Sequence, residues 1–88
     1  MHAVVVRVTI EDREAAEKAL KAEIVPRVSQ APGFVAGYWT NVGSDQGRSM
    51  IVFESEDAAS SAEANIREDA PDFVTFDSIE TGEVVAHA

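Results

Sequence analysis

The chain lacks cysteine and is poor in histidine, because its 88 residues include only His2 and His87. Without cysteine, neither a disulfide nor a thiolate-bound metal stabilises the fold. A metal site needs three or four ligands that converge, and two histidines near the chain ends do not provide them. The sequence therefore predicts neither a metal site nor a bound cofactor.

Basic side chains are also scarce, since seven Lys and Arg face sixteen Asp and Glu and give a formal net charge of -9. Nucleic acids and anionic membranes are bound through clustered Lys and Arg, so this balance excludes both as expected partners. The stretch MHAVVVRVTI is too short to span a membrane and lacks a basic region and a cleavage site. We therefore expect a cytoplasmic protein.

Familiar catalytic motifs are missing as well: the sequence has no glycine-rich dinucleotide motif, P-loop or nucleophile elbow. Glu54 and Glu56 flank an expected helix start, where the helix dipole accounts for them. Asp77 and Glu80 fall in the last expected strand, where exposed charges discourage pairing at a sheet edge. No catalytic residue is assigned, because the sequence has no HxxxH motif and no carboxylate–histidine cluster.

The residues that are present predict a first strand over His2–Ile10, which is rich in β-branched side chains. Arg7 interrupts it, either as a salt-bridge partner near the sheet edge or as a positive charge facing a cavity. A helix follows from Arg13 to about Gln30, with Asp12 as its N-cap. Pro26 predicts a kink or a broken last turn in this helix. Its buried stripe comprises Ala16, Ala19, Leu20, Ile24 and Val28.

A hairpin holds the centre of the chain, with strands over Phe34–Asn41 and Arg48–Glu54 and a turn over 42–47. The first of these strands contains the only Trp and the only Tyr. Alternation places Trp39 and Tyr38 on opposite faces, so at most one of them lines a given cavity. Gly37 predicts the close approach of a backbone, a bulky side chain or a ligand.

A second helix is expected after Ser55, its predicted N-cap, and before Pro71. The last strand is expected over Phe73–Ile79, and Gly82 then marks a predicted bulge or bend within one long C-terminal strand. The helix carries a stripe of small residues, which predicts close packing on the sheet: Ala58, Ala59, Ala62, Ile66 and Ala70.

The element order β-α-β-β-α-β over residues 1–88 predicts one α+β domain with a ferredoxin-like fold. Right-handed crossovers give an antiparallel sheet in the order 4-1-3-2, with two helices on one face. The other face carries more apolar side chains than a monomer of this size usually exposes. A chain of this length buries only about 60% of its surface. The sequence therefore predicts a homodimer that closes through the sheet face.

Three features resemble the dimeric α+β barrel superfamily, in particular its antibiotic-biosynthesis-monooxygenase-like group: APGFVAGYW, FESEDAA and the proline-interrupted first helix. The resemblance implies a barrel formed by two sheets, with a cavity between the sheet and the helices of each subunit. Known members include cofactor-independent oxygenases, quinol oxygenases, isomerases and haem-degrading oxygenases. The Asn, Trp and His combination of the haem-degrading members is not matched in this chain.

The cofactor-free oxygenases of this group surround aromatic substrates with Trp, Tyr, Asn, Arg or His. The resemblance therefore implies a substrate-binding set of Tyr38, Trp39, Asn41, Arg48 and Arg7. Two functions stay open: a cofactor-independent monooxygenase-like protein acting on a small aromatic or quinol-type molecule, or a non-catalytic dimeric module that binds a small ligand or is structural. Trp39 belongs either to a core or dimer interface or to the wall of an aromatic site.

Overall fold

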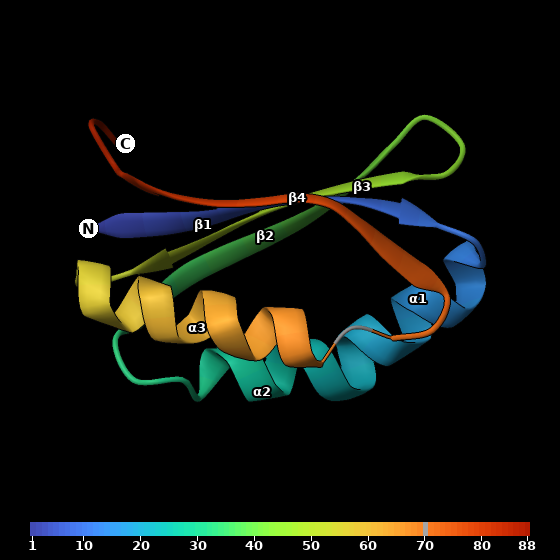
Figure 1. Cartoon of the computed structure of the whole chain (residues 1–88), viewed down its shortest axis with the longest axis horizontal. Coiled ribbons are helices and arrows are strands. Elements are labelled where there is room, and N and C mark those ends of the chain that lie inside the picture. The colour runs from blue at the N-terminus through green and yellow to red at the C-terminus, as the bar shows by residue number, and fades with distance from the viewer. Residues whose placement is uncertain (70) are drawn as a thin grey trace.

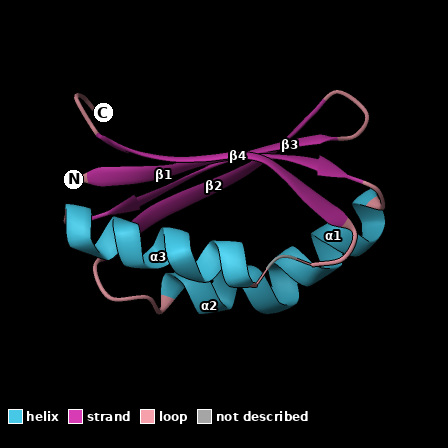
Figure 2. Ribbon diagram, viewed as in Figure 1, coloured by secondary structure: helices cyan, strands magenta, loops and turns pink. Residues whose placement is uncertain are grey.

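The computed structural model describes residues 1–69 and 71–88, and it confirms the expected order of strands and helices (Figure 2). The first helix is divided into three segments, of which the middle one is π-helical. The elements are β1 (His2–Ile10), α1 (Arg13–Ala19), η1 (Leu20–Ile24), α2 (Val25–Ser29), β2 (Phe34–Val42), β3 (Gln46–Phe53), α3 (Glu56–Glu68) and β4 (Val74–Glu83).

The strands of the described residues form one antiparallel sheet in the order β2-β3-β1-β4, which confirms the predicted topology. All helical segments lie on one side of this sheet, and its other side stays uncovered (Figure 1). The chain is therefore an α+β protein with the ferredoxin-like fold. No described helix is long and apolar enough to cross a membrane.

The first helical segment begins where the sequence predicts, because the Asp12 carboxylate accepts a hydrogen bond from Ala15 N at 3.0 Å. The expected disturbance at Pro26 is present but lies upstream of that residue. The amide of Val25 donates to Leu20 O, five residues back, which defines the π turn η1. Proline has no amide hydrogen to donate, and the helix around it accommodates the lost bond by widening before it instead of fraying after it.

The second helix, α3, packs closely against the sheet. Ser55 is its N-cap, as predicted, with its hydroxyl accepting from Ala58 N at 3.2 Å. Ala59 and Ala62 are buried, which confirms that small side chains let this helix approach the strands. The last member of the predicted stripe, Ala70, lies outside the described residues.

The predicted bulge at Gly82 is wrong. Gly82 pairs in register with Ala3, and β4 ends at Glu83. The irregularity lies further back, where Arg7 pairs with Ser78 but Val8 pairs with Phe76, so that Asp77 has no partner in register. A bulge inserts one unpaired residue, and the register between strands decides its place irrespective of where a glycine occurs.

The two faces of the sheet differ in composition. On the helix side, Phe34 and Phe53 meet edge to face with centroids 6.1 Å apart. We call the uncovered side the open face; it includes Tyr38, 68% exposed, and Met50, 47% exposed. The buried core lies on the helix side and comprises Val4, Val6, Ile51, Phe53, Ala59, Ala62 and Ile79.

Candidate functional site

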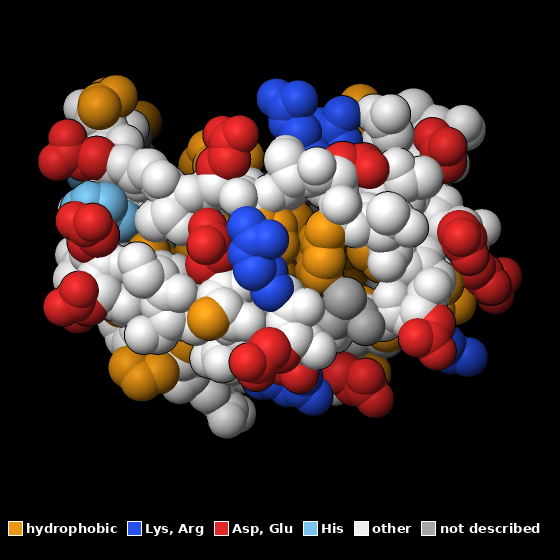
Figure 3. All heavy atoms as spheres, viewed as in Figure 1, with side chains coloured by type: hydrophobic (Ala, Val, Ile, Leu, Met, Phe, Trp, Pro, Cys, Tyr) orange, Lys and Arg blue, Asp and Glu red, His pale blue; other side chains and the backbone are white. Residues whose placement is uncertain are grey.

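A cavity of about 430 Å³ lies between the sheet and the helices. It lies mainly beneath α1, η1 and α2, which contribute more of the lining than α3 does. These three segments have no buried residue, whereas α3 has two. The space-filling view shows apolar side chains recessed between the strand layer and the helix layer (Figure 3). The cavity therefore opens to solvent while its interior stays apolar.

Most of the lining is aliphatic or aromatic, as is typical of sites for small organic molecules. β1 contributes alternate residues from the helix side of the sheet, and β4 contributes Val74 and Phe76. Four residues of the first helical region lie above them, spaced four apart. The main apolar lining residues are Val6, Val8, Ile10, Ala16, Leu20, Ile24, Val28, Phe53, Ile66, Val74 and Phe76.

Trp39 forms part of the cavity wall on β2. Its indole ring lies over Gly37, since a Cβ added at Gly37 would be 2.8 Å from Trp39 Cη2. The predicted close approach at Gly37 is thereby confirmed, and the approaching group is a bulky side chain. The missing side chain at position 37 leaves room for the ring.

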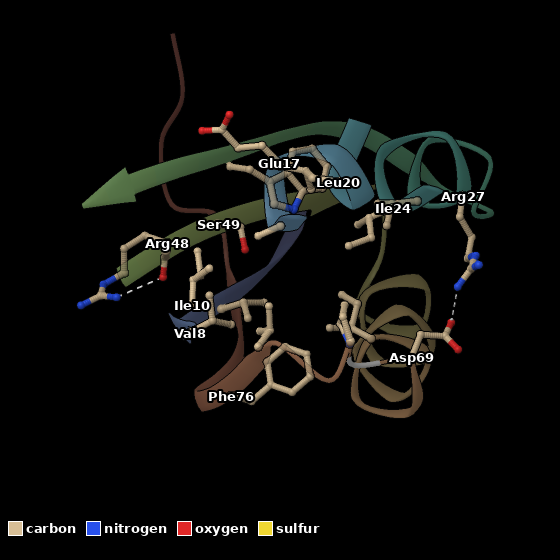
Figure 4. A pocket seen from close by; sticks show the side chains of 18 of the residues that line it. Val8, Ile10, Glu17, Leu20, Ile24, Arg27, Arg48, Ser49, Asp69 and Phe76 are labelled. Carbon is tan, nitrogen blue, oxygen red and sulfur yellow. Dashed lines mark hydrogen bonds and ion pairs between the residues drawn. The ribbon is translucent and has the colours of Figure 1, made fainter. Parts of the chain in front are cut away.

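Ser49 lies directly opposite Trp39 in the β2–β3 register and also lines the cavity. Its side chain points toward the cavity between the apolar residues of neighbouring strands (Figure 4). No described residue forms a hydrogen bond with this hydroxyl. Ser49 was not among the predicted site residues, although it alternates with Ile51 and Phe53 in the second hairpin strand and so shares their face.

Asn41 lies on the same face as Trp39, at the rim of the cavity. Its amide Nδ2 donates to Glu17 Oε1 at 3.0 Å, which connects β2 to α1. Both residues line the cavity. The hydrogen bond fixes the orientation of the Glu17 carboxylate at this rim.

A second rim lies between α2 and the end of α3. Here Arg27 Nη1 and Asp69 Oδ2 form an ion pair at 3.0 Å, with side chains that are 61% and 51% exposed (Figure 4). An exposed pair of this kind contributes about 1 kcal/mol or less to stability. Its position across the gap between two helices makes it part of the cavity rim.

Of the remaining three predicted site residues, Arg48 belongs to the cavity lining and the other two do not. Tyr38 and Arg7 belong to the open face, on the side of the sheet away from the cavity. Arg48 is the register partner of Arg7, and its guanidinium points away from the cavity lining (Figure 4). The structure thus brings Trp39, Asn41 and Arg48 to the cavity lining and places Tyr38 and Arg7 on the other side of the sheet.

Haem or a metal ion bound in the cavity would need suitable ligand side chains in its lining. Haem iron is usually held by His, Cys, Met or Tyr. None of the described lining residues is of these types. No group of three or more His, Cys, Asp or Glu suited to a metal ion occurs among residues 1–69 and 71–88.

No family model matches the chain, and no curated protein matches it significantly. Solved structures do match. MupZ from Pseudomonas fluorescens is 21% identical with a TM-score of 0.71 over 91% of this chain, which spans 65% of the MupZ chain. SnoaB, a cofactor-independent oxygenase from Streptomyces nogalater, is 14% identical with a TM-score of 0.70, covering 98% of this chain and 94% of its own.

A third similar structure is a dimeric ferredoxin-like protein from an uncultured marine organism, 14% identical with a TM-score of 0.67 over 100% of this chain and 98% of its own. A heme degrader is also among the solved structures with this arrangement. Identities this low show a common fold alone. These structural neighbours are dimeric α+β barrel proteins of the antibiotic-biosynthesis-monooxygenase-like group, among them a cofactor-independent oxygenase and a heme degrader, and the chain shares their fold.

Proposed function

We propose that this chain is a cofactor-independent monooxygenase-like protein whose cavity binds a small aromatic molecule with a phenolic or quinol-type hydroxyl. The observation that supports the proposal is the cavity of about 430 Å³, apolar in most of its lining, with Trp39, Ser49 and Asn41 on one wall. A volume of this size suits a ligand of two or three fused rings. The fold neighbours include a cofactor-independent oxygenase, which is consistent with the proposal.

The wall residues suggest how such a ligand is oriented. A planar ring stacks against the Trp39 indole, and the aliphatic side chains of the helices cover its other face. The Ser49 hydroxyl, which has no hydrogen-bond partner among the described residues, is available to the ligand hydroxyl. A hydrogen bond made in a water-poor cavity is stronger than one made in water.

The proposed reaction uses dioxygen as its only co-reactant. Loss of the hydroxyl proton gives a phenolate, and its electron pair forms a C–O bond between the para carbon and dioxygen. The C–H bond at that carbon and the O–O bond then break. One oxygen atom stays on the ring as a carbonyl, and the other leaves as water with the two hydrogens. Four electrons pass from the ring to dioxygen, so the product is a quinone.

Glu17 is the residue we assign to accept the hydroxyl proton. Two carboxylates line the cavity, and Asp69 is already paired with Arg27 at the other rim. Glu17 is held by a neutral amide, that of Asn41, so its charge stays available. General base catalysis of this kind contributes about 10²- to 10⁴-fold to a rate.

The second candidate is a non-catalytic module that binds a small ligand. It is favoured by the chemistry of the interior, because the charged lining residues with described ion pairs or hydrogen bonds lie at the rims and the deeper lining is apolar. Binding needs no proton acceptor, whereas the reaction does. Separate measurements of binding and oxygen consumption therefore distinguish the two candidates.

The test uses 1-naphthol with the full chain, with calorimetry for binding and an oxygen electrode for turnover. We expect Ser49→Ala and Trp39→Phe to weaken binding about 3- to 30-fold. Glu17→Gln keeps an oxygen for Asn41, so binding should change less than threefold while oxygen uptake falls about 100-fold. The matched control is Glu14→Gln, an exposed residue of the same helix that does not line the cavity.

Three outcomes decide between the candidates. Failure of 1-naphthol to bind at millimolar concentration contradicts the cavity proposal itself. Binding without any oxygen uptake by the unaltered chain supports the module. Equal oxygen uptake in Glu17→Gln and Glu14→Gln rejects the role of Glu17 and leaves the binding site in place.

We also propose that the chain forms a homodimer through the open face. The apolar side chains exposed there support this assembly, as does the dimeric state of a ferredoxin-like neighbour. Haem is not proposed as a ligand, because the described cavity lining has no axial-ligand side chain. A cytoplasmic location stays a prediction.

A further inference from the structure

Two arginines lie directly opposite each other on the open face: Arg7 on β1 and Arg48 on β3. Like charges on opposite cross-strand positions destabilise a sheet. The arrangement is unexpected in a chain with sixteen acidic and seven basic residues. The ion pairs of the described residues include neither arginine.

The hydrogen bonds of Arg48 do not neutralise this pair. Its Nη1 donates to Gly47 O at 3.0 Å and its Nη2 donates to Gln46 Oε1 at 2.8 Å, and both acceptors are uncharged. Arg7 is exposed and donates no hydrogen bond to a described residue. Basic side chains are visible along the side of the sheet away from the helices (Figure 3). Neither guanidinium therefore forms an ion pair within the described part of the single subunit.

The same face carries carboxylates on β4. Glu80 is exposed and pairs in register with Val5, two residues along the strand from the Arg7–Ser78 pair and on the same face. Asp77, the unpaired residue of the bulge, accepts a hydrogen bond from Thr9 Oγ1 at 2.8 Å. The open face is thus basic at its central strands and acidic at one edge.

A face with separate basic and acidic regions is electrostatically complementary to the same face of a second copy. In a two-fold dimer the same patch is used by both subunits, so a basic region that lies off the symmetry axis meets a different region of the other copy. We propose that the Arg7–Arg48 pair binds the carboxylates of Glu80 and Asp77 in a second copy of this chain. The inference rests on the homodimer proposed above and identifies the contacts that orient it.

Apolar contacts alone make this interface modest. Strand spacings of about 4.8 Å and rises of about 3.3 Å give the sheet a projected area on the order of 500 Å². Stable interfaces bury about 800 Å² per partner. A hollow of about 260 Å³ bounded by Ala3, Val5, Met50 and Val85 provides some further contact area. At this size, a few ion pairs have a large share in the affinity.

The ionic contacts predict that dimerisation depends on salt. Screening weakens attraction between charges that remain partly hydrated. Sedimentation equilibrium of the full chain should show the dimer dissociation constant rising about 10-fold between 50 and 500 mM NaCl. The mutual attraction of the two patches also predicts a charge-swap effect.

The decisive variants are Arg7→Glu, Glu80→Arg and the double exchange. Each single exchange should weaken the dimer at least 10-fold, and the double exchange should return it to within about threefold of the unaltered chain. The control Lys18→Glu makes the same change in net charge as Arg7→Glu, on a helix remote from the open face. Circular dichroism shows that each variant keeps its fold, and Arg7→Gln with Glu80→Gln repeat the comparison with neutral replacements.

The outcomes separate the inference from the assembly on which it rests. A dimer whose affinity responds to Arg7→Glu no more than to Lys18→Glu overturns the ionic contacts and leaves the homodimer intact. A single exchange that weakens the dimer without rescue by the double exchange also overturns the proposed pairing. A monomer at 100 µM for the unaltered chain rejects the homodimer together with the inference.

Discussion

Gly37 is a residue of the sheet at which an added side chain has almost no room. The Trp39 ring occupies the volume that a side chain would need there. Gly33 differs from it. Any other residue there would be strained by a φ of +79° and would also come too close to Ala58. At Gly37 the constraint is steric alone, and it acts on a residue of the proposed ligand site.

We predict that Gly37→Ala lowers the free energy of unfolding by about 1 to 3 kcal/mol, as overpacking in a core does. The new methyl group would lie 2.8 Å from Trp39 Cη2, so the indole must move. Urea unfolding measures the effect. Gly82→Ala is the matched control, since nothing lies within 4 Å of its added Cβ. An equal loss in both variants would contradict the steric explanation.

Predictions for single residues succeeded where the feature depends on neighbours in the chain, and failed where it depends on tertiary packing. The N-caps Asp12 and Ser55 and the crowding at Gly37 depend on near neighbours in the chain, and the structure confirms them. Ser49 was not anticipated, because its access to the cavity depends on a helix from another part of the sequence. The side of the sheet on which Trp39 meets a cavity likewise depends on where the helices pack.

Among the elements, α3 depends most clearly on a local interaction at its first turn. Ser55 satisfies the amide of Ala58 and precedes two acidic residues in the first turn. Such a cap contributes about 1 kcal/mol. Because Ala59 and Ala62 bury little area, the cap has a larger relative share in holding this helix than it would in a helix with bulky core residues.

Ser55→Ala should therefore reduce the free energy of unfolding by about 0.5 to 2 kcal/mol. Ser60→Ala provides the control within the same helix, because Ser60 is exposed and lies in the helix interior. Alanine is the better helix former there, so this control should be neutral or slightly stabilising. Chemical denaturation compares the two; the cap assignment fails if both variants lose the same stability.

Element boundaries and irregularities show where sequence patterns stop being informative. Topology and strand positions follow from alternation and turn residues, and these predictions are confirmed. The bulge was expected at Gly82 but occurs at Asp77, since the pairing of β1 with β4 determines it. Pro26 predicts a break in the helix, but it does not predict that the break is a π turn upstream of the proline.

At the scale of the whole molecule, the cavity is a stability cost as well as a site. Apolar surface inside it stays accessible to solvent and loses about 25 cal/mol per Å² of the stabilisation that burial would provide. An apolar hollow of about 430 Å³ is large for 88 residues. The molecule therefore retains space that a more complete core would have filled.

Ala16→Leu, which fills part of the cavity from α1, should bury apolar surface there and raise the free energy of unfolding by about 1 kcal/mol. Ala22→Leu is the control, because Ala22 is exposed on η1 and does not line the cavity. Urea unfolding followed by Trp39 fluorescence measures both. A similar shift in the two variants would show that added hydrophobicity, and not cavity filling, is responsible.

The π turn η1 has a consequence for the angular phase of the first helical region. In a straight α-helix of 3.6 residues per turn, residues four apart rotate by about 40° at each step, so Val28 would lie about 120° around the axis from Ala16. A π turn holds more residues, and across it the same step rotates the other way. Ala16, Leu20, Ile24 and Val28 consequently all reach the cavity. One π turn therefore lets residues spaced strictly four apart line the helix side of the cavity without a gap.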